Sequence, residues 1–106
     1  PQLDPWVINK LSPIKVFLCT FKLMRNFFVY VIKNQQNILY TGIAKDIDRR
    51  LEEHNSGKGA KFTRGRGPWK LTYTEGPFKH GDAIRREVEI KKNKLIKRRL
   101  KNTKQD

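Results

Sequence analysis

Residues 28–54 read FVYVIKNQQNILYTGIAKDIDRRLEEH, and this stretch predicts two strands followed by a helix. The apolar run 27–32 is β-branched and aromatic on both alternating faces, which suits a central strand covered on both sides. The polar residues 34–37 suit a turn, residues 38–41 form a second short strand, and Gly42 is expected to end it. Two strands so close in sequence predict an antiparallel hairpin.

The length of the turn decides the register of this hairpin. A three-residue loop over 34–36 pairs Tyr30 with Tyr40 and places both rings on one face of the sheet. A four-residue loop pairs Tyr30 with Thr41 and sends Tyr40 to the other face, because a slip of one residue inverts a strand. The sequence leaves both registers open.

The helix that follows has a buried stripe and a polar rim. Asp46 suits the N-cap or the first turn, where an acid is favoured by the helix dipole. Ile47 and Leu51 are four residues apart and mark the stripe that faces the core. Arg50 and His54 are also four apart, on a face that borders this stripe. We therefore expect the guanidinium and the imidazole at the rim of the core.

A basic, glycine-rich loop comes next, and residues 55–67 read NSGKGAKFTRGRG. No acid interrupts its cations, so we expect it to contact phosphates, with Phe62 either anchoring the loop or stacking on a base. The alternative is a flexible, solvated linker. The loop is not a P-loop, because the Gly-Lys-Ser/Thr ending is absent. The expected nucleic-acid-binding residues are Lys58, Lys61, Arg64 and Arg66.

The residues after the loop predict a third strand. Trp69, Leu71 and Tyr73 alternate with polar residues over 69–74, which indicates one covered face. Gly76-Pro77 is expected to break this strand.

The C-terminal part predicts two helices. The first is expected from about Asp82 or Ala83, with His80 in the loop before it, and Asn93 is expected to interrupt it. The second helix, over 94–100, carries a dense set of lysines and arginines. This basic end is either a solvated helix or a further phosphate contact.

Together these elements predict an α/β (α+β) domain in which a three-stranded antiparallel sheet is layered with helices. The domain is expected over residues 27–101, with a polar tail over 102–106. Residues 1–26 are expected to be a leader of low order, with Met24 as a sensible start of the domain. The alternative is an extra segment that docks on the domain through Trp6 and Phe17.

The composition points to a polyanionic partner. The chain has 106 residues, the size of one domain, a net charge of +14 and a pI of about 10.3. Such a positive field attracts DNA, RNA or, less strongly, an anionic membrane, and charge alone favours a nucleic-acid-binding protein without chemistry. Cys19 is the single cysteine, which excludes an intrachain disulfide. No secretory signal or membrane span is visible, so the cytoplasm is the predicted location.

The spacing of several polar residues resembles that of the GIY-YIG endonucleases over about residues 27–100. Phe28-Val29-Tyr30 stands where this family has Gly-Ile-Tyr, and Tyr40-Thr41-Gly42 stands where it has Tyr-Ile-Gly. Arg50 and His54 follow at the positions of the family's arginine and of its His/Tyr, and Glu87 matches its metal-binding glutamate.

The resemblance is to the small stand-alone branch that is related to the nuclease domains of UvrC and of intron-encoded enzymes. Two departures are visible: Phe and Val replace Gly and Ile in the first tripeptide, and Ile43 stands where UvrC-type domains carry a lysine.

The resemblance implies a metal-dependent endonuclease that hydrolyses DNA phosphodiester bonds, with a role in repair or recombination. It implies Mg²⁺ or Mn²⁺ held by Glu87, Tyr30 helping to deprotonate water, and Tyr40 sharing this role or positioning the phosphate. It further implies that Arg50 binds the phosphate and that His54 assists proton transfer. A base role for Tyr30 needs a cation nearby, and Arg50 and the metal could supply it. DNA is the expected partner, and a partner protein or a dimer is compatible with the sequence.

Each of these residues also has an ordinary structural interpretation. The two tyrosines suit strands without any chemistry. Arg50 could pair with Asp46, His54 could interact with the helix dipole, and Glu87 could pair with Lys91. The alternative to the endonuclease is therefore a non-catalytic nucleic-acid-binding module with a nuclease fold.

Overall fold

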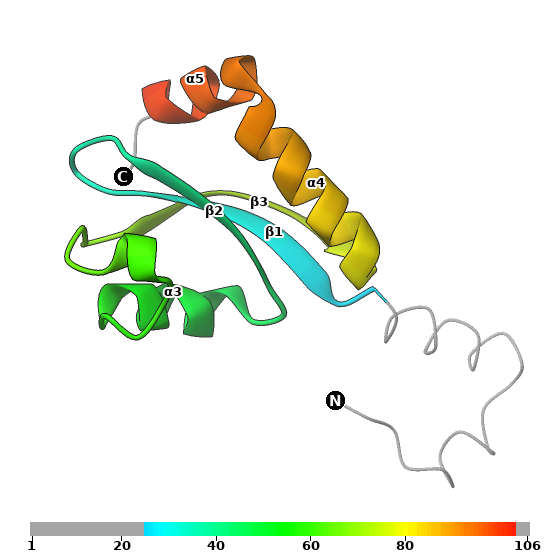
Figure 1. Ribbon diagram of the computed structural model, residues 1–106, viewed down its shortest axis with the longest axis horizontal. Helices are drawn as coiled ribbons and strands as arrows, with labels where there is room; N and C mark the ends of the chain where they lie inside the picture. Colours follow the sequence, from blue (N-terminus) through cyan, green and yellow to red (C-terminus); the bar gives the residue numbers. More distant parts are fainter. Residues whose placement is uncertain (1–24, 104–106) are drawn as a thin grey trace, which may run out of the picture.

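The computed structural model describes residues 25–103 as a three-stranded antiparallel sheet with three α-helices (Figure 1). The strand order is β2-β1-β3. This architecture confirms the predicted fold class. In chain order the elements are β1 Phe27–Lys33, β2 Leu39–Ala44, α3 Ile47–Asn55, the 3-10 turn η1 Lys61–Thr63, β3 Lys70–Phe78, α4 His80–Lys92 and α5 Lys94–Asn102.

Helices cover both faces of the sheet: α3 lies on one face, and α4 and α5 lie on the other (Figure 1). The side chains of β1 divide between the two layers. Val29 and Val31 pack with Ile90 of α4, whereas Tyr30 and Ile32 belong to the cluster beneath α3. All four are at most 1% exposed, as expected for a central strand covered on both sides.

The hairpin turn begins one residue later than a loop over 34–36 would. The Asn34 amide donates to the carbonyl of Ile38 at 3.1 Å, which leaves residues 35–37 as the turn. The Asn34 side chain supports this turn, because its Oδ1 accepts from the Ile38 amide at 2.9 Å. Asn37 takes a left-handed backbone conformation (φ 65°), which asparagine tolerates better than most residues.

The resulting register differs from both predicted ones, but it keeps the two tyrosines together. Tyr30 pairs with Gly42, and Ile32 pairs with Tyr40. Since positions 40 and 42 of a strand share a face, Tyr30 and Tyr40 lie on the same side of the sheet.

The prediction of one covered face on the third strand is wrong, because β3 contains a bulge. Val31 pairs with Tyr73 and Ile32 with Leu71, so Thr72 is an extra residue in β3. Tyr73 consequently packs toward the α4 layer, while Leu71 lies on the other face and is 38% exposed.

The prediction that Gly76-Pro77 breaks the strand is also wrong, since β3 continues to Phe78. Phe27 pairs with Phe78 and Val29 with Glu75, so a second irregularity absorbs the Gly-Pro pair. Gly76 has φ 134°, a conformation that glycine adopts without steric cost.

The helix ends follow the sequence signals closely. Asp46 caps α3 by accepting from the Arg49 amide at 3.1 Å. Asn93 ends α4 and caps α5 through its side chain, which confirms the predicted interruption. His80 is not a loop residue, because α4 begins there and its ring contacts Phe27 with centroids 4.5 Å apart.

Most of the predicted leader, 1–26, lies outside the described residues, as do residues 104–106 of the predicted tail. Within 25–103, none of the helices has the length and apolar character needed to cross a bilayer.

Candidate active site

Tyr30 reaches the candidate site by lying across the edge strand β2 at Gly42. A Cβ atom added at Gly42 would come within 2.5 Å of the Tyr30 hydroxyl oxygen, so the absent side chain leaves the space for the phenol. The prediction that Gly42 ends the strand is wrong, because β2 continues to Ala44 and the glycine accommodates a ring rather than a turn. Tyr30 itself is only 1% exposed.

Three buried side chains form a hydrogen-bonded chain from β1 through α3 into the basic loop. The Tyr30 hydroxyl lies 2.7 Å from Nε2 of His54, and Nδ1 of His54 lies 2.8 Å from Oγ1 of Thr63. The Thr63 hydroxyl donates its one proton to the carbonyl of Ala60 at 2.8 Å. Its oxygen therefore accepts from Nδ1–H of His54, which leaves Nε2 to accept from the phenol. This order of donors fixes the neutral tautomer of His54.

Burial keeps the phenol and the imidazole of this hydrogen-bonded chain neutral. Desolvation raises the pKa of Tyr30 to about 12, although the neighbouring Arg50 guanidinium acts in the opposite direction. Desolvation also lowers the pKa of His54, and the positive charge of Arg50 adds to this effect. Both groups are neutral at pH 7, so burial outweighs the lowering of the Tyr30 pKa that Arg50 was predicted to supply.

Arg50 lies between the buried phenol and a carboxylate on its own helix. Its Nη1 donates to Oε1 of Glu53 at 2.9 Å, and this interaction raises the pKa of Arg50. The pairing with Asp46 that the sequence left open does not occur, because Asp46 caps the helix instead. About one third of the Arg50 side chain is exposed, so the guanidinium is accessible at the rim of the core.

Tyr40 of β2 packs against the imidazole, and Phe62 of the basic loop packs against Tyr40. The ring of Tyr40 meets His54 edge-on with centroids 5.1 Å apart, and Phe62 stacks on Tyr40 at 6.0 Å. The guanidinium of Arg66 lies 4.4 Å from the centroid of Phe62, within cation–π range. These contacts fit the predicted anchoring role of Phe62, and its stacking on a base stays a prediction.

The basic loop is tied to the site and is not a free linker. Thr63 bonds to His54, and its carbonyl accepts from the indole of Trp69 at 3.1 Å. The carbonyl of Arg66 accepts from the side chain of Asn34 at 2.9 Å. The four predicted phosphate ligands, Lys58, Lys61, Arg64 and Arg66, are all exposed on this anchored segment.

Glu87 comes from α4, on the other side of the sheet. Its side chain is 21% exposed and pairs with Lys91 at 3.3 Å, so the ordinary i,i+4 interaction is present. Among the described residues it forms no hydrogen bond or ion pair with the other four predicted site residues. Its negative charge nevertheless acts on Tyr30 and raises the pKa of the phenol.

A bidentate ion pair holds the part of α4 that carries Glu87. Arg86 donates to both carboxylate oxygens of Glu75 on β3, at 2.6 and 2.7 Å. Glu75 also accepts from the hydroxyl of Tyr73 at 2.6 Å. Such a fork between a guanidinium and a carboxylate fixes orientation as well as distance. Arg86, the residue before Glu87, therefore ties α4 to the sheet through Glu75.

The donor set fits a magnesium-type ion that is held loosely by protein. No group of three or more His, Cys, Asp or Glu side chains within 25–103 could hold a metal ion, so a cage made by protein alone is absent from this part. Mg²⁺ often takes only one or two carboxylates and fills its remaining positions with water and phosphate oxygens. The partly buried carboxylate of Glu87, which pairs with Lys91, is one donor of the kind that such an ion uses.

Two residues of this site were missed in the sequence. Thr63 is 1% exposed and orients His54, yet it sits nine positions downstream in a loop where nothing sets it apart. Gly59 packs directly against His54, and a side chain there would collide with the imidazole. The only visible signal was the unusual density of glycines in the loop.

Known proteins resemble this chain over most of its length. The model of the GIY-YIG catalytic domain matches residues 26–102. A UPF0213 protein of Staphylococcus aureus strain Mu3 is 45% identical over 82 residues, which cover 72% of this chain and all of that protein, and the UPF0213 protein of strain Mu50 gives the same figures. The solution NMR structure of a UPF0213 protein from Bacillus halodurans is 41% identical and covers 70% of this chain and 80% of that one, with a TM-score of 0.43. The matched residues include the whole sheet, all three α-helices and every predicted site residue, and this chain therefore belongs to the GIY-YIG family.

Proposed function

We propose that this protein is a metal-dependent endonuclease that hydrolyses DNA phosphodiester bonds. The observation that carries the proposal is the buried chain from Tyr30 through His54 to Thr63, with Arg50 beside it. Such a chain, with a fixed tautomer and an accessible cation at its end, suits the removal of a proton next to a phosphate. Membership of the GIY-YIG family supports a nuclease-type function.

In the proposed reaction the protein moves one proton away from the attacking water. A neutral phenol with a pKa of about 12 is a poor base alone, but it can pass its proton to Nε2 of His54 as it takes one from water. The net result is hydroxide at the phosphorus and an imidazolium at His54. Thr63 keeps accepting from Nδ1–H throughout, so the ring does not have to turn.

The cations at the rim of the core would stabilise the negative charge that develops on the phosphate. Arg50 can offer a planar fork to the phosphate oxygens, and the loop cations can hold the flanking backbone. When bound, the metal would neutralise phosphate charge, assist the leaving oxygen and lower the pKa of water. Glu87 is the residue that would hold it, and Tyr40 would position the phosphate against Arg50.

A plasmid-nicking assay tests this proposal. Supercoiled plasmid with Mg²⁺ or Mn²⁺ is incubated with wild-type protein and with Glu87→Gln and Arg50→Gln, and we expect each substitution to lower the nicking rate by about 100-fold. Matched controls are Glu89→Gln on the same helix and Arg49→Gln, whose side chain is 78% exposed. Equal rates for all five proteins would remove the proposed site.

A second candidate is a binding module that holds DNA without cutting it. The observation in its favour is the Glu87–Lys91 pair, because a carboxylate that already has a cationic partner need not bind a metal. This candidate predicts tight, salt-sensitive DNA binding that is unaffected by Mg²⁺ and gives no products. Metal-dependent nicking by the wild type excludes it.

The cellular setting belongs to the proposal as well. Repair or recombination is the setting that we infer for a DNA endonuclease of this family, and the cytoplasm is the location that we infer from cysteine usage. Assembly with a partner protein or a second copy also stays a prediction.

A further inference from the structure

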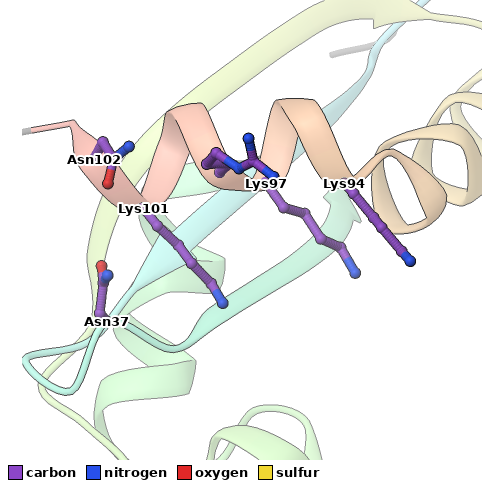
Figure 2. A pocket seen from close by; sticks show the side chains of 6 residues that line it. Asn37, Lys94, Lys97, Lys101 and Asn102 are labelled. Atoms are coloured by element: carbon purple, nitrogen blue, oxygen red, sulfur yellow. The ribbon is translucent and has the colours of Figure 1, made fainter.

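A basic groove lies between α5 and the turn of the β1–β2 hairpin (Figure 2). Its volume is about 380 Å³. Helix α5 lies on the face of the sheet opposite α3, so the groove is separate from the part of the candidate active site that Tyr30, His54 and Thr63 form (Figure 1). Four cations and two amides line it: Asn37, Lys94, Lys97, Arg98, Lys101 and Asn102.

Within residues 25–103, the cations of the groove have no anionic partners. The ion pairs formed by the described residues involve α3, β3 and α4, and none involves a side chain of α5. Helix α5 contains no acid at all, since its sequence is KLIKRRLKN. The five cations of this short helix, four of which line the groove, repel one another, and an anionic ligand would relieve that repulsion.

The spacing of the lysines suits a row of phosphates. Lys94, Lys97 and Lys101 follow one another along α5, and their side chains extend in the same direction (Figure 2). At about 1.5 Å per residue they span about 10 Å of helix. Duplex nucleic acid carries about one charge per 1.7 Å of its axis, so several phosphates fall within that span.

A buried lysine fixes the helix that carries these cations. Lys33 of β1 is 6% exposed, and its ammonium donates to the carbonyls of Leu100, Lys101 and Thr103 at 3.0, 3.2 and 2.7 Å. The cation thereby satisfies carbonyls at the C-terminal end of α5, where the helix dipole is negative. The groove is therefore presented by a docked helix and not by a frayed terminus.

We propose that this groove binds the sugar–phosphate backbone of duplex nucleic acid, as a second contact surface remote from the candidate active site. The inference rests on the geometry and charge of α5 and does not require catalysis. Lysines contact phosphates as point charges without reading sequence, so the contact is expected to be independent of sequence.

A matched pair of double variants tests the groove. Lys97→Gln/Lys101→Gln removes two groove cations, and Lys45→Gln/Lys79→Gln removes the same charge from exposed positions outside it. Binding of a fluorescent 20-base-pair DNA duplex is measured in EDTA over a series of salt concentrations. We expect the groove variant to bind about tenfold more weakly at low salt, and its slope of log K against log salt to fall by about two. The control variant should keep the wild-type slope.

The outcomes separate this proposal from its rivals. Equal losses in both variants would overturn it, because net charge alone would then explain binding. Strong binding of the wild type to vesicles containing phosphatidylserine, with no change in duplex affinity for the groove variant, would also overturn it in favour of a membrane surface. Wild-type unfolding temperatures for both variants exclude misfolding as the cause. Since no step uses metal or cleavage, failure of the nicking assay leaves this result unaffected.

Discussion

A single hydroxyl, that of Thr63, decides which nitrogen of His54 carries the proton. Valine has nearly the same shape but cannot accept from Nδ1–H, so Thr63→Val removes the acceptor that holds the Nδ1–H tautomer. We expect the nicking rate to fall at least tenfold, with an altered pH profile, while Thr63→Ser retains activity. An unchanged pH profile in Thr63→Val would show that the hydroxyl serves packing alone.

The space above Gly42 is filled by the Tyr30 phenol, so the glycine has no room for a methyl group. Gly42→Ala should destabilise the fold by about 1–3 kcal/mol, because the ring must move or the strand must shift. Gly81→Ala is the matched control: it lies in α4, and the nearest atom to its new Cβ would be 3.9 Å away. The control should gain about 1 kcal/mol, since alanine favours helix over glycine. Urea unfolding of both variants measures the difference, and equal effects would contradict the close approach of Tyr30.

His54 makes the stability of the fold depend on pH. Its folded pKa is lowered by burial, so the unfolded chain binds the proton more tightly than the folded one. The stabilisation is therefore complete above the unfolded pKa of about 6.5 and is lost as the pH falls through the folded pKa. We expect the free energy of unfolding to be lower at about pH 5 than at about pH 7.5. His80→Gln should keep this dependence, and a flat profile in the wild type would mean that His54 is solvated.

At the scale of the elements, the docking of α5 depends on the ammonium of Lys33. Lys33→Met keeps the stem but deletes three donors to carbonyls at the helix end, which should cost about 2 kcal/mol. For a domain of this size that corresponds to a fall of about 10 °C in unfolding temperature. Lys70→Met, at the paired and exposed position of β3, should change the unfolding temperature little. Circular dichroism during heating measures both, and equal temperatures would contradict the role of Lys33.

Local signals predicted the elements well, but they did not predict how the elements meet. Asp46 and Asn93 mark helix ends through caps that involve neighbouring residues alone. The hairpin register was not predicted, because it depends on a hydrogen bond from the Ile38 amide to the side chain of Asn34. The faces of β3 were not predicted either, because the bulge at Thr72 leaves no mark on the local pattern of apolar and polar residues.

In the candidate site, too, the sequence predicted the residues that local elements position and missed one that depends on contacts between elements. The spacing of Tyr30, Tyr40, Arg50 and His54 predicted four side chains that the structure does bring together, since a hairpin and one helix determine their positions. Thr63 could not be predicted, because its contact with His54 requires the loop to fold back over the helix.

Taken whole, the molecule presents cations on two opposite faces of one thin sheet. The loop of residues 58–66 lies with α3, and the groove lies with α5, so the sheet separates them (Figure 1). Sites that share no contacts usually contribute to binding additively, within about 0.5 kcal/mol. Lys58→Gln/Lys61→Gln, the groove variant Lys97→Gln/Lys101→Gln and the combined quadruple variant should therefore form an additive cycle in duplex affinity. Cleavage of bound DNA should fall only in the variants of the loop, because the loop alone is tied to His54. A coupling above about 1 kcal/mol would mean that both sets of lysines hold the same phosphates, and the two surfaces would then have to be treated as one.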